Sequence, residues 1–158
     1  MESMKDQIEP IKVVARYTDG SLLKGFTHDF FPNKDLFHVT PADQALGKPI
    51  EVLVHHLKAV FVVRDFSGDP HYAERKVYSK EDTPYGVPLE ITFADAEVMV
   101  GSSMGFDPKR SGFFISPVDP MSNNPRVFVV TSAVKRVRRI HLKSGYYFEI
   151  PLSGKRRE

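Results

Sequence analysis

The chain has 158 residues, 41% of them hydrophobic and 27% charged, with a formal net charge of +2, so it suits one ordinary domain or two small ones. It contains no cysteine, which excludes disulfides, thiolate metal sites and a cysteine nucleophile. It has no run of about 18 apolar residues and no secretory signal at its start, so we expect a cytoplasmic protein without a membrane partner.

Charge is distributed unevenly along the chain. Residues 135–158 contain eight Lys or Arg and two Glu, a local sum of +6 that leaves −4 on the remainder. A basic end on an acidic body indicates either an anionic partner or a solubilising tail, and both interpretations stay open.

Alternation of apolar and polar residues predicts a series of short strands after a polar, flexible N-terminus. Asp19-Gly20 predicts a tight turn, and Gly25 marks a bend within a strand. The strands expected in this half cover residues 11–17, 22–30, 36–40, 50–54 and 59–64.

The stretch from Asp19 to Asp43 recurs at Asp95 to Asp119, at a constant shift of 76 positions that becomes 77 from Ile50 onward. The recurring residues are Asp, Gly, Phe and Pro, as in the match of Gly25 with Gly101. This internal repeat predicts two copies of one five-stranded unit.

Three segments outside the first copy need separate interpretation. Within residues 132–140, Val134, Val137 and Ile140 have helical spacing, but the counterpart 57–63 is rich in β-branched residues, so we expect a short turn followed by a strand. Residues 65–88 contain three prolines and two glycines and predict a linker, with one short strand at 75–78. Residues 145–152 predict a last strand that either pairs with an open edge or crosses to the other copy.

The order strand, Asp-Gly turn, bent strand, loop, third strand and two strands joined by a short turn resembles the Sm-like and SH3-like small β-barrels. The chain departs from the Sm motif, since Ala96 replaces the turn glycine in the second copy. Three stretches, at residues 17–25, 57–68 and 122–130, resemble an uncharacterised bacterial family of duplicated small barrels. That family has no assigned activity, so the resemblance transfers no functional residue.

The repeat and the resemblance together imply an all-β fold of two tandem five-stranded SH3-like/Sm-like small barrels related by internal duplication, plus a C-terminal extra strand. The corresponding divisions are a flexible N-terminus (1–10), a first barrel (11–64), a linker (65–88), a second barrel (89–141) and an extra strand with a basic tail (142–158).

Catalytic and metal chemistry find little support in the sequence. The histidines of the first copy, His28, His38, His55 and His56, are replaced in the second copy by Met104, Phe114, Ser132 and Ala133. A metal that held the fold would therefore be missing from one copy, so we expect no metal. Without a nucleophile elbow or a phosphate loop, we expect neither an enzyme nor a cofactor.

Binding groups are the better candidates. We expect Phe30 and Phe106 to plug their own barrels, while exposed aromatic, amide and basic groups of the loops contact a partner. The loop candidates are Phe31, Asn33, Lys109, Arg110, Asn123, Asn124 and Arg126. For the amides of the 120–126 loop, a structural role in its own turn is the alternative.

A basic strip formed by Lys135, Arg136, Arg138 and Arg139 suits phosphate or an acidic partner, and a solvated charged strand is the alternative. We therefore expect a non-catalytic adaptor of a bacterial cytoplasmic regulatory system that contacts a protein partner through loops or a strand edge. The alternative is an Sm-like nucleic-acid binder that uses the basic strip. In either case the function is expected where the two copies differ.

Overall fold

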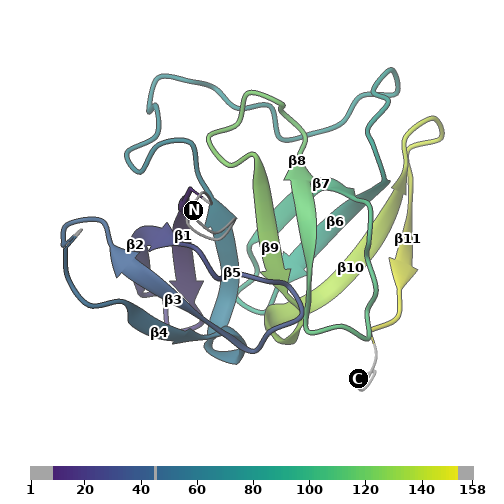
Figure 1. Ribbon diagram of the computed structural model, residues 1–158. Coiled ribbons are helices and arrows are strands. Elements are labelled where there is room, and N and C mark those ends of the chain that lie inside the picture. Colours follow the sequence, from purple (N-terminus) through teal and green to yellow (C-terminus); the bar gives the residue numbers. More distant parts are fainter. Residues whose placement is uncertain (1–8, 45, 153–158) are drawn as a thin grey trace, which may run out of the picture.

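The computed structural model describes residues 9–44 and 46–152 (Figure 1). Their strands all belong to one 11-stranded sheet, in which every neighbouring pair is antiparallel. In the first half lie β1 (Ile11–Tyr17), β2 (Leu22–Thr27), β3 (Leu36–Pro41), β4 (Ile50–Leu53), the 3-10 turn η2 (Val54–His56) and β5 (Leu57–Val62). In the second half lie β6 (Val87–Phe93), β7 (Val98–Ser103), β8 (Gly112–Pro117), β9 (Arg126–Val130), the 3-10 turn η3 (Thr131–Ala133), β10 (Val134–His141) and β11 (Tyr146–Ile150).

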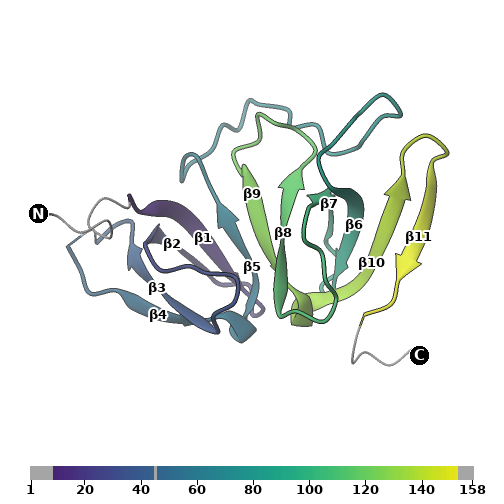
Figure 2. The ribbon, with the colours of Figure 1, turned by 45° about the vertical axis from the view of Figure 1, so that its right-hand side comes forward.

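The two halves repeat one pattern of strand pairing. In the first unit, β1 pairs with β2 and β5, β2 with β3, and β3 with β4. In the second unit, β6 pairs with β7 and β10, β7 with β8, and β8 with β9. Each of the first three strands of the first unit begins 76 positions before its counterpart in the second. The 3-10 turns η2 and η3, and the strands β5 and β10 that follow them, begin 77 positions apart. The units lie side by side (Figure 2).

The expected all-β class is confirmed. The strand order is β11-β10-β6-β7-β8-β9-β5-β1-β2-β3-β4, so the sheet is open, with β11 and β4 at its two ends. Closure of each unit into a separate small barrel therefore stays a prediction.

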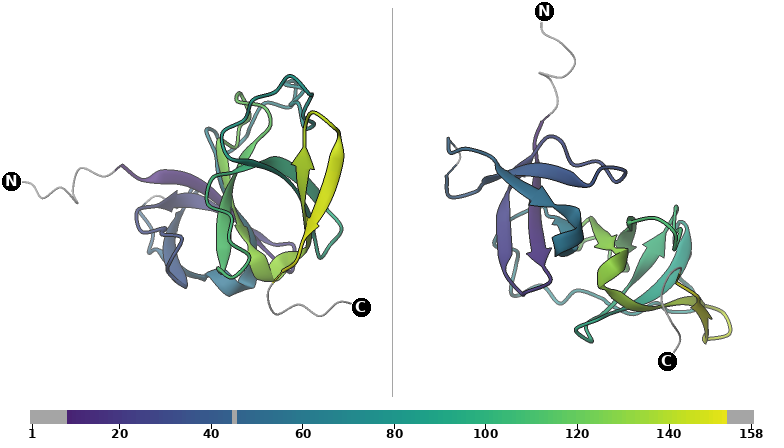
Figure 3. Two further views of the ribbon diagram at one scale, coloured as in Figure 1. Left: turned by 90° about the vertical axis from the view of Figure 1, so that its right-hand side faces the viewer. Right: turned by 90° about the horizontal axis from the view of Figure 1, so that it is seen from below.

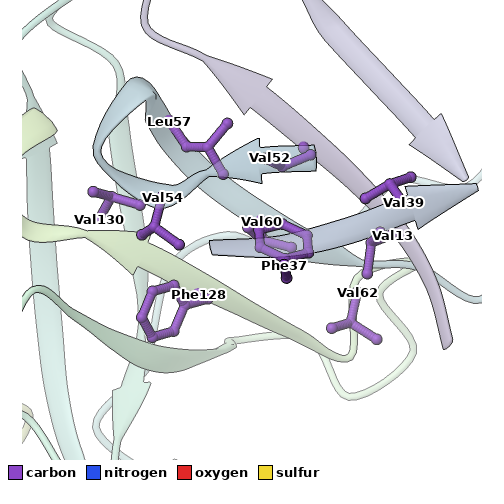
Figure 4. Close-up of a cluster of buried hydrophobic side chains, with 11 residues drawn as sticks. Val13, Phe37, Val39, Val52, Val54, Leu57, Val60, Val62, Phe128 and Val130 are labelled. Carbon is purple, nitrogen blue, oxygen red and sulfur yellow. The ribbon is translucent and has the colours of Figure 1, made fainter. Parts of the chain in front are cut away.

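β5 and β9 pair where the two units meet (Figure 3). They form a shared wall between two hydrophobic cores. Val60 and Val62 of β5, with Phe128 and Val130 of β9, face the first core (Figure 4). On the other side of the wall, Ala59 of β5 and Val127 and Val129 of β9 belong to the second core, against which Phe61 packs.

This wall explains why neither strand alternates in sequence. A strand buried on both faces needs apolar residues at every position, and the runs Ala-Val-Phe-Val and Val-Phe-Val-Val provide them. Full burial of a side chain such as Phe128, which is 1% exposed, contributes about 1.5–3 kcal/mol. Each unit thus supplies part of its neighbour's core.

Gly25 and Gly101 occupy the bends expected from the repeat. A Cβ on Gly25 would overlap the carbonyl oxygen of Thr40, and one on Gly101 would overlap that of Ser116. In both units the glycine pairs with the proline at the end of the next strand. Only glycine lets the neighbouring backbone approach this closely.

The C-terminal strands agree with the sequence expectations, whereas the end of β2 and part of the linker differ from them. The turn and strand expected at 132–140 are confirmed as η3 and β10, and the last strand, β11, pairs with the edge of β10. The strand expected over 22–30 ends at Thr27, where Asp29 accepts hydrogen bonds from Thr27 and His38 instead. The strand expected at 75–78 is wrong, because Arg75 and Asp82 tie that segment into a loop.

The flexible N-terminus expected at 1–10 and the expected basic tail fall mostly on residues 1–8 and 153–158, which lie outside the described residues. In the part of the chain that is described, no helix has the length and apolar character needed to cross a membrane.

Candidate functional site: the outer edge of β4

The clearest difference between the two units lies at β4 and β9, which occupy equivalent places. β9 is paired on both sides, with β8 and with β5. Within residues 9–44 and 46–152, β4 is paired with β3 alone. We call its other side, away from β3, the outer edge of β4.

Two residues of β4 direct their backbone groups toward this outer edge. The Val54 amide donates to the Asp35 carbonyl at 2.9 Å, so the N–H group of Val54 points toward β3. Because backbone groups alternate in direction along a strand, the N–H and C=O groups of Glu51 and the N–H group of Leu53 point outward, whereas the Leu53 carbonyl begins the η2 turn. These positions can bond an added strand without disturbing the β3–β4 ladder.

The equivalent groups in the second unit show such a strand in place. Phe128 and Val130 correspond to Glu51 and Leu53, and Phe128 lies directly opposite Val60 of β5. In the second unit this edge is therefore covered by β5, an apolar strand. In the first unit the equivalent edge belongs to β4 and carries the Glu51 carboxylate.

Apolar and acidic groups border the outer edge of β4. Ile50 of β4 is 42% exposed, and Leu36 of β3, which lies opposite Leu53, is 40% exposed. His38 lies opposite Glu51, and its Nδ1 atom is 2.7 Å from Oδ2 of Asp29. Partial burial acts to raise the pKa of Asp29, but hydrogen bonds from His38 and Thr27 outweigh it and hold that pKa below its ordinary value of 3.8. Along β4, Ile50, Val52 and Leu53 are apolar, and Glu51 places a carboxylate on the face away from the core.

The loop candidates do not form one surface. Phe31 is 46% exposed with the Lys34 ammonium 5.2 Å from its ring, and Asn33 is exposed in the same loop. Lys109 and Arg110 are exposed in the β7–β8 loop of the other unit, where Asp107 accepts the Lys109 amide at 2.9 Å.

Phe30 does more than plug its own unit. Its ring packs on Phe37 at 4.8 Å, and also on Phe128 at 5.2 Å and Phe114 at 6.1 Å in the second unit. Phe106 packs within its own unit, on Phe113 at 4.7 Å.

The 120–126 loop is fastened to the end of the first unit. The Asn123 side chain donates to the Asp65 carbonyl at 2.9 Å and accepts the Asp65 amide at 3.0 Å. Arg64 donates to the carbonyl of Ser122 at 3.0 Å. Asn124 is half-buried, and the Arg126 guanidinium lies 4.7 Å from the ring of Phe114. Asn123 thus has a structural role, although toward the linker rather than its own turn.

The basic strip is divided between the two faces of β10. Pairing places Arg136 and Arg138 beside Thr92 and Glu90, whereas Arg139 lies opposite Leu89 on the core side. Arg138 is bound by Glu90, with Nε 2.7 Å from its Oε1, and stacks on Tyr147 at 4.4 Å. Lys135 is exposed at the register shift between Val134 and Arg136. The four side chains therefore do not make one continuous strip.

A family of unknown function (DUF6982) matches residues 8–141, which include both units. The chain belongs to this family. A search of curated proteins and a search of solved structures each gave no match. The expected membership of an uncharacterised family is thus confirmed for most of the chain. The match assigns no residue a role, so the site rests on geometry.

A buried lysine that the sequence did not single out joins the two units. Lys58 is 6% exposed, and its ammonium lies 2.7 Å from Oδ2 of Asp95, 2.5 Å from Oε1 of Glu97 and 4.6 Å from the ring of Phe93. The hydrogen bond from Lys58 is the main reason that the pKa of Asp95 lies below its ordinary value of 3.8. This cluster holds the β6–β7 turn against the first unit.

Asp119 fixes the linker in a comparable way. Its carboxylate accepts hydrogen bonds from the Tyr72 hydroxyl at 2.6 Å, the Arg75 amide at 3.0 Å and the Met121 amide at 2.9 Å. The equivalent residue of the first unit, Asp43, is exposed. The buried side chains of Lys58 and Asp119 thus both help to connect the two units.

A groove of about 470 Å³ lies between the linker and the sheet, and most of the charged side chains that line it are already paired. Arg16 lies 3.4 Å from Glu97, and Glu90 binds Arg138. Among the described residues, no group of three His, Asp or Glu side chains is placed to hold a metal ion.

Proposed function

We propose that the protein is a non-catalytic binding module that takes an extended segment of another protein as an additional strand on the outer edge of β4. The observation that carries this proposal is the pairing of β9 with β5 at the equivalent edge. The duplicated fold already accepts a strand in that place, in antiparallel orientation and with apolar contacts. Strand addition of this kind is a common mode of peptide recognition.

The chemistry of the edge suits this role. The outward backbone groups of Glu51 and Leu53 provide hydrogen bonds that any extended peptide can make. Exposed Ile50 and half-buried Leu53 provide apolar surface on the two faces of β4, and each buried CH₂ of a ligand adds about 0.8 kcal/mol. A setting in a bacterial cytoplasmic regulatory system is part of the same proposal.

Peptides selected from a random library against the full chain test the proposal. The selected peptides are expected to slow amide hydrogen exchange at Glu51 and Leu53. Glu51→Pro removes the outward N–H without breaking the β3–β4 ladder and is expected to weaken binding by about 100-fold, since proline is tolerated on strand edges. Glu51→Gln keeps the N–H and is expected to stay within about tenfold of the parent. Equal binding to the parent and to Glu51→Pro would overturn the proposal.

A second candidate, single-stranded nucleic acid, is favoured by one feature of the β10–β11 hairpin. Arg139 is paired with Phe148 and His141 with Tyr146, so these four side chains share a face. Phe148 and Tyr146 are 55% and 67% exposed. Exposed aromatic rings beside cations suit base stacking and phosphate contact.

Binding to generic single-stranded RNA at increasing salt tests this candidate. Phosphate contacts make affinity fall steeply, with a slope of about −0.7 per contact on logarithmic axes. The Arg139→Ala variant, which removes the cation of this face, is expected to reduce that slope by about one contact. If no RNA binds at low salt, or if the variant binds as the parent does, this candidate is abandoned.

We also propose that each unit is an SH3-like/Sm-like small barrel. Support comes from the strand order within each unit, the bends at Gly25 and Gly101, and the 3-10 turns between the fourth and fifth strands.

A further inference from the structure

The β5–β9 ladder shows which partner residue would meet each position of β4. Ala59, Val60 and Phe61 of β5 lie opposite Val129, Phe128 and Val127 of β9. Moved to the first unit, the same register places three successive residues of a bound segment opposite Val52, Glu51 and Ile50. The first and third of these residues face the core of the unit, and the second lies on the other face, together with Glu51.

The environment of these three positions differs in character. On the core side, Ile50 is 42% exposed and Val52 belongs to the first hydrophobic core, so apolar partner residues suit both positions. On the outward side, Glu51 neighbours His38, which is held by Asp29. A cation opposite Glu51 is attracted by that carboxylate, whereas an anion is repelled by it.

A second copy of the chain fits this edge poorly. In the β5–β9 register, β10 of another copy would set Val137 against Glu51 and turn Arg136 and Arg138 toward the apolar core side. The edge of β10 is also already covered by β11. Pairing of β4 with β4 would bring two Glu51 carboxylates onto one face, and like charges there are destabilising. Charged groups of this kind oppose self-assembly at a strand edge.

Building on the proposed function, we infer that the outer edge of β4 selects an extended segment in which a Lys or Arg stands between two apolar residues. The apolar pair follows from the core-side positions and the cation from Glu51. The partner is therefore a protein with an exposed or unfolded strand of apolar–basic–apolar pattern, not another copy of this chain.

Three peptides based on residues 57–63, the segment that covers the equivalent edge of β9, provide the probe. They carry Lys, the native Val or Glu at position 60 and a fluorescent label on a hydrophilic spacer. Each is titrated into the full chain by fluorescence polarisation, and protection of the Glu51 and Leu53 amides is measured by hydrogen exchange. The Lys peptide is expected to bind about tenfold more tightly than the Glu peptide. In the Glu51→Lys protein this order is expected to reverse.

The outcomes separate this inference from the proposed function. If all three peptides protect Glu51 and Leu53 with the same affinity, the preference for a basic residue is wrong while strand addition at β4 stands. If none of the peptides protects these amides, strand addition at β4 is contradicted together with the preference. Reversal of the order in Glu51→Lys supports both.

Discussion

Val60 of β5 lies directly opposite Phe128 of β9, and both side chains face the first hydrophobic core. One unit's last strand and the other unit's fourth strand therefore make a single wall. Since Ala59 and Val129 face the second core from the same two strands, neither unit has a complete core by itself. The two halves are expected to fold and unfold together.

Phe128→Ala tests the shared wall. The ring is 1% exposed and packs on Phe30 and Phe114, so its removal leaves a cavity between the units. The free energy of unfolding is expected to fall by about 3–5 kcal/mol in a single transition. Urea denaturation followed by circular dichroism measures it. Met121→Ala, at a side chain 70% exposed, is the control with little effect. Two separate transitions in the parent protein would contradict the shared wall.

Substitution of the bend glycines tests the close approach of the strands. Gly25→Ala and Gly101→Ala each drive a Cβ into a neighbouring carbonyl oxygen, whereas a Cβ on Gly105 meets nothing within 4 Å. Thermal denaturation is expected to show a loss of about 1–3 kcal/mol for the first two variants. Gly105→Ala is expected to match the parent. Similar stability in all three variants would show that the bends do not need glycine.

Lys58→Met tests the buried ion pair between the units. A carboxyl whose pKa is lowered on folding stabilises the protein above its unfolded pKa, and this contribution is lost as pH falls. Because the Asp95 pKa lies below 3.8 in the folded protein, the parent is expected to lose stability below about pH 4. At pH 7 the variant is expected to be less stable by about 1 kcal/mol, a difference that narrows toward pH 3.

The matched control for that experiment is Lys135→Met, at the equivalent but exposed position of the second unit. Its stability is expected to follow the parent at every pH. A difference between Lys58→Met and the parent that is independent of pH would assign Lys58 a packing role alone.

Asp119→Asn tests how the linker is held. The substitution weakens the acceptor shared by Tyr72 and Arg75, so residues 65–86 are expected to be cleaved several-fold faster in limited proteolysis. Asp43→Asn changes the equivalent residue of the first unit and is expected to leave the cleavage rate unchanged. Equal cleavage of both variants would show that Asp119 does not hold the linker.

The sequence predicted the strands well because the period-two pattern and the repeat both act locally. It did not predict the shared wall, since the apolar runs of β5 and β9 indicate burial on both faces but not what covers each face. Lys58 and Lys135 are equivalent in sequence, yet only the pairing of β5 with β9 brings Asp95 and Glu97 to Lys58. Which lysine is buried is thus a property of the assembled units.

The candidate site was predicted only in outline. A strand edge was expected as one contact surface, but nothing in the run Ile-Glu-Val-Leu shows that it ends the sheet. The basic strip does not form one surface, because adjacent strand residues such as Arg138 and Arg139 point to opposite faces. The register shift after Val134 decides which face each arginine takes, and the sequence does not show that shift. Asn123 attracted attention as a polar loop residue, and its partner, Asp65, lies 58 positions away.

Hydrogen exchange at two pairs of equivalent amides tests most directly whether the outer edge of β4 is the binding site. In the protein alone at low concentration, the Glu51 and Leu53 amides are expected to exchange rapidly, because they point to the outer edge of β4. The Phe128 and Val130 amides, at the same places in β9, are expected to exchange at least about 100-fold more slowly, because β5 covers them. Exchange at Glu51 and Leu53 as slow as at Phe128 and Val130 would show that the edge is already covered and would contradict its role as the binding site.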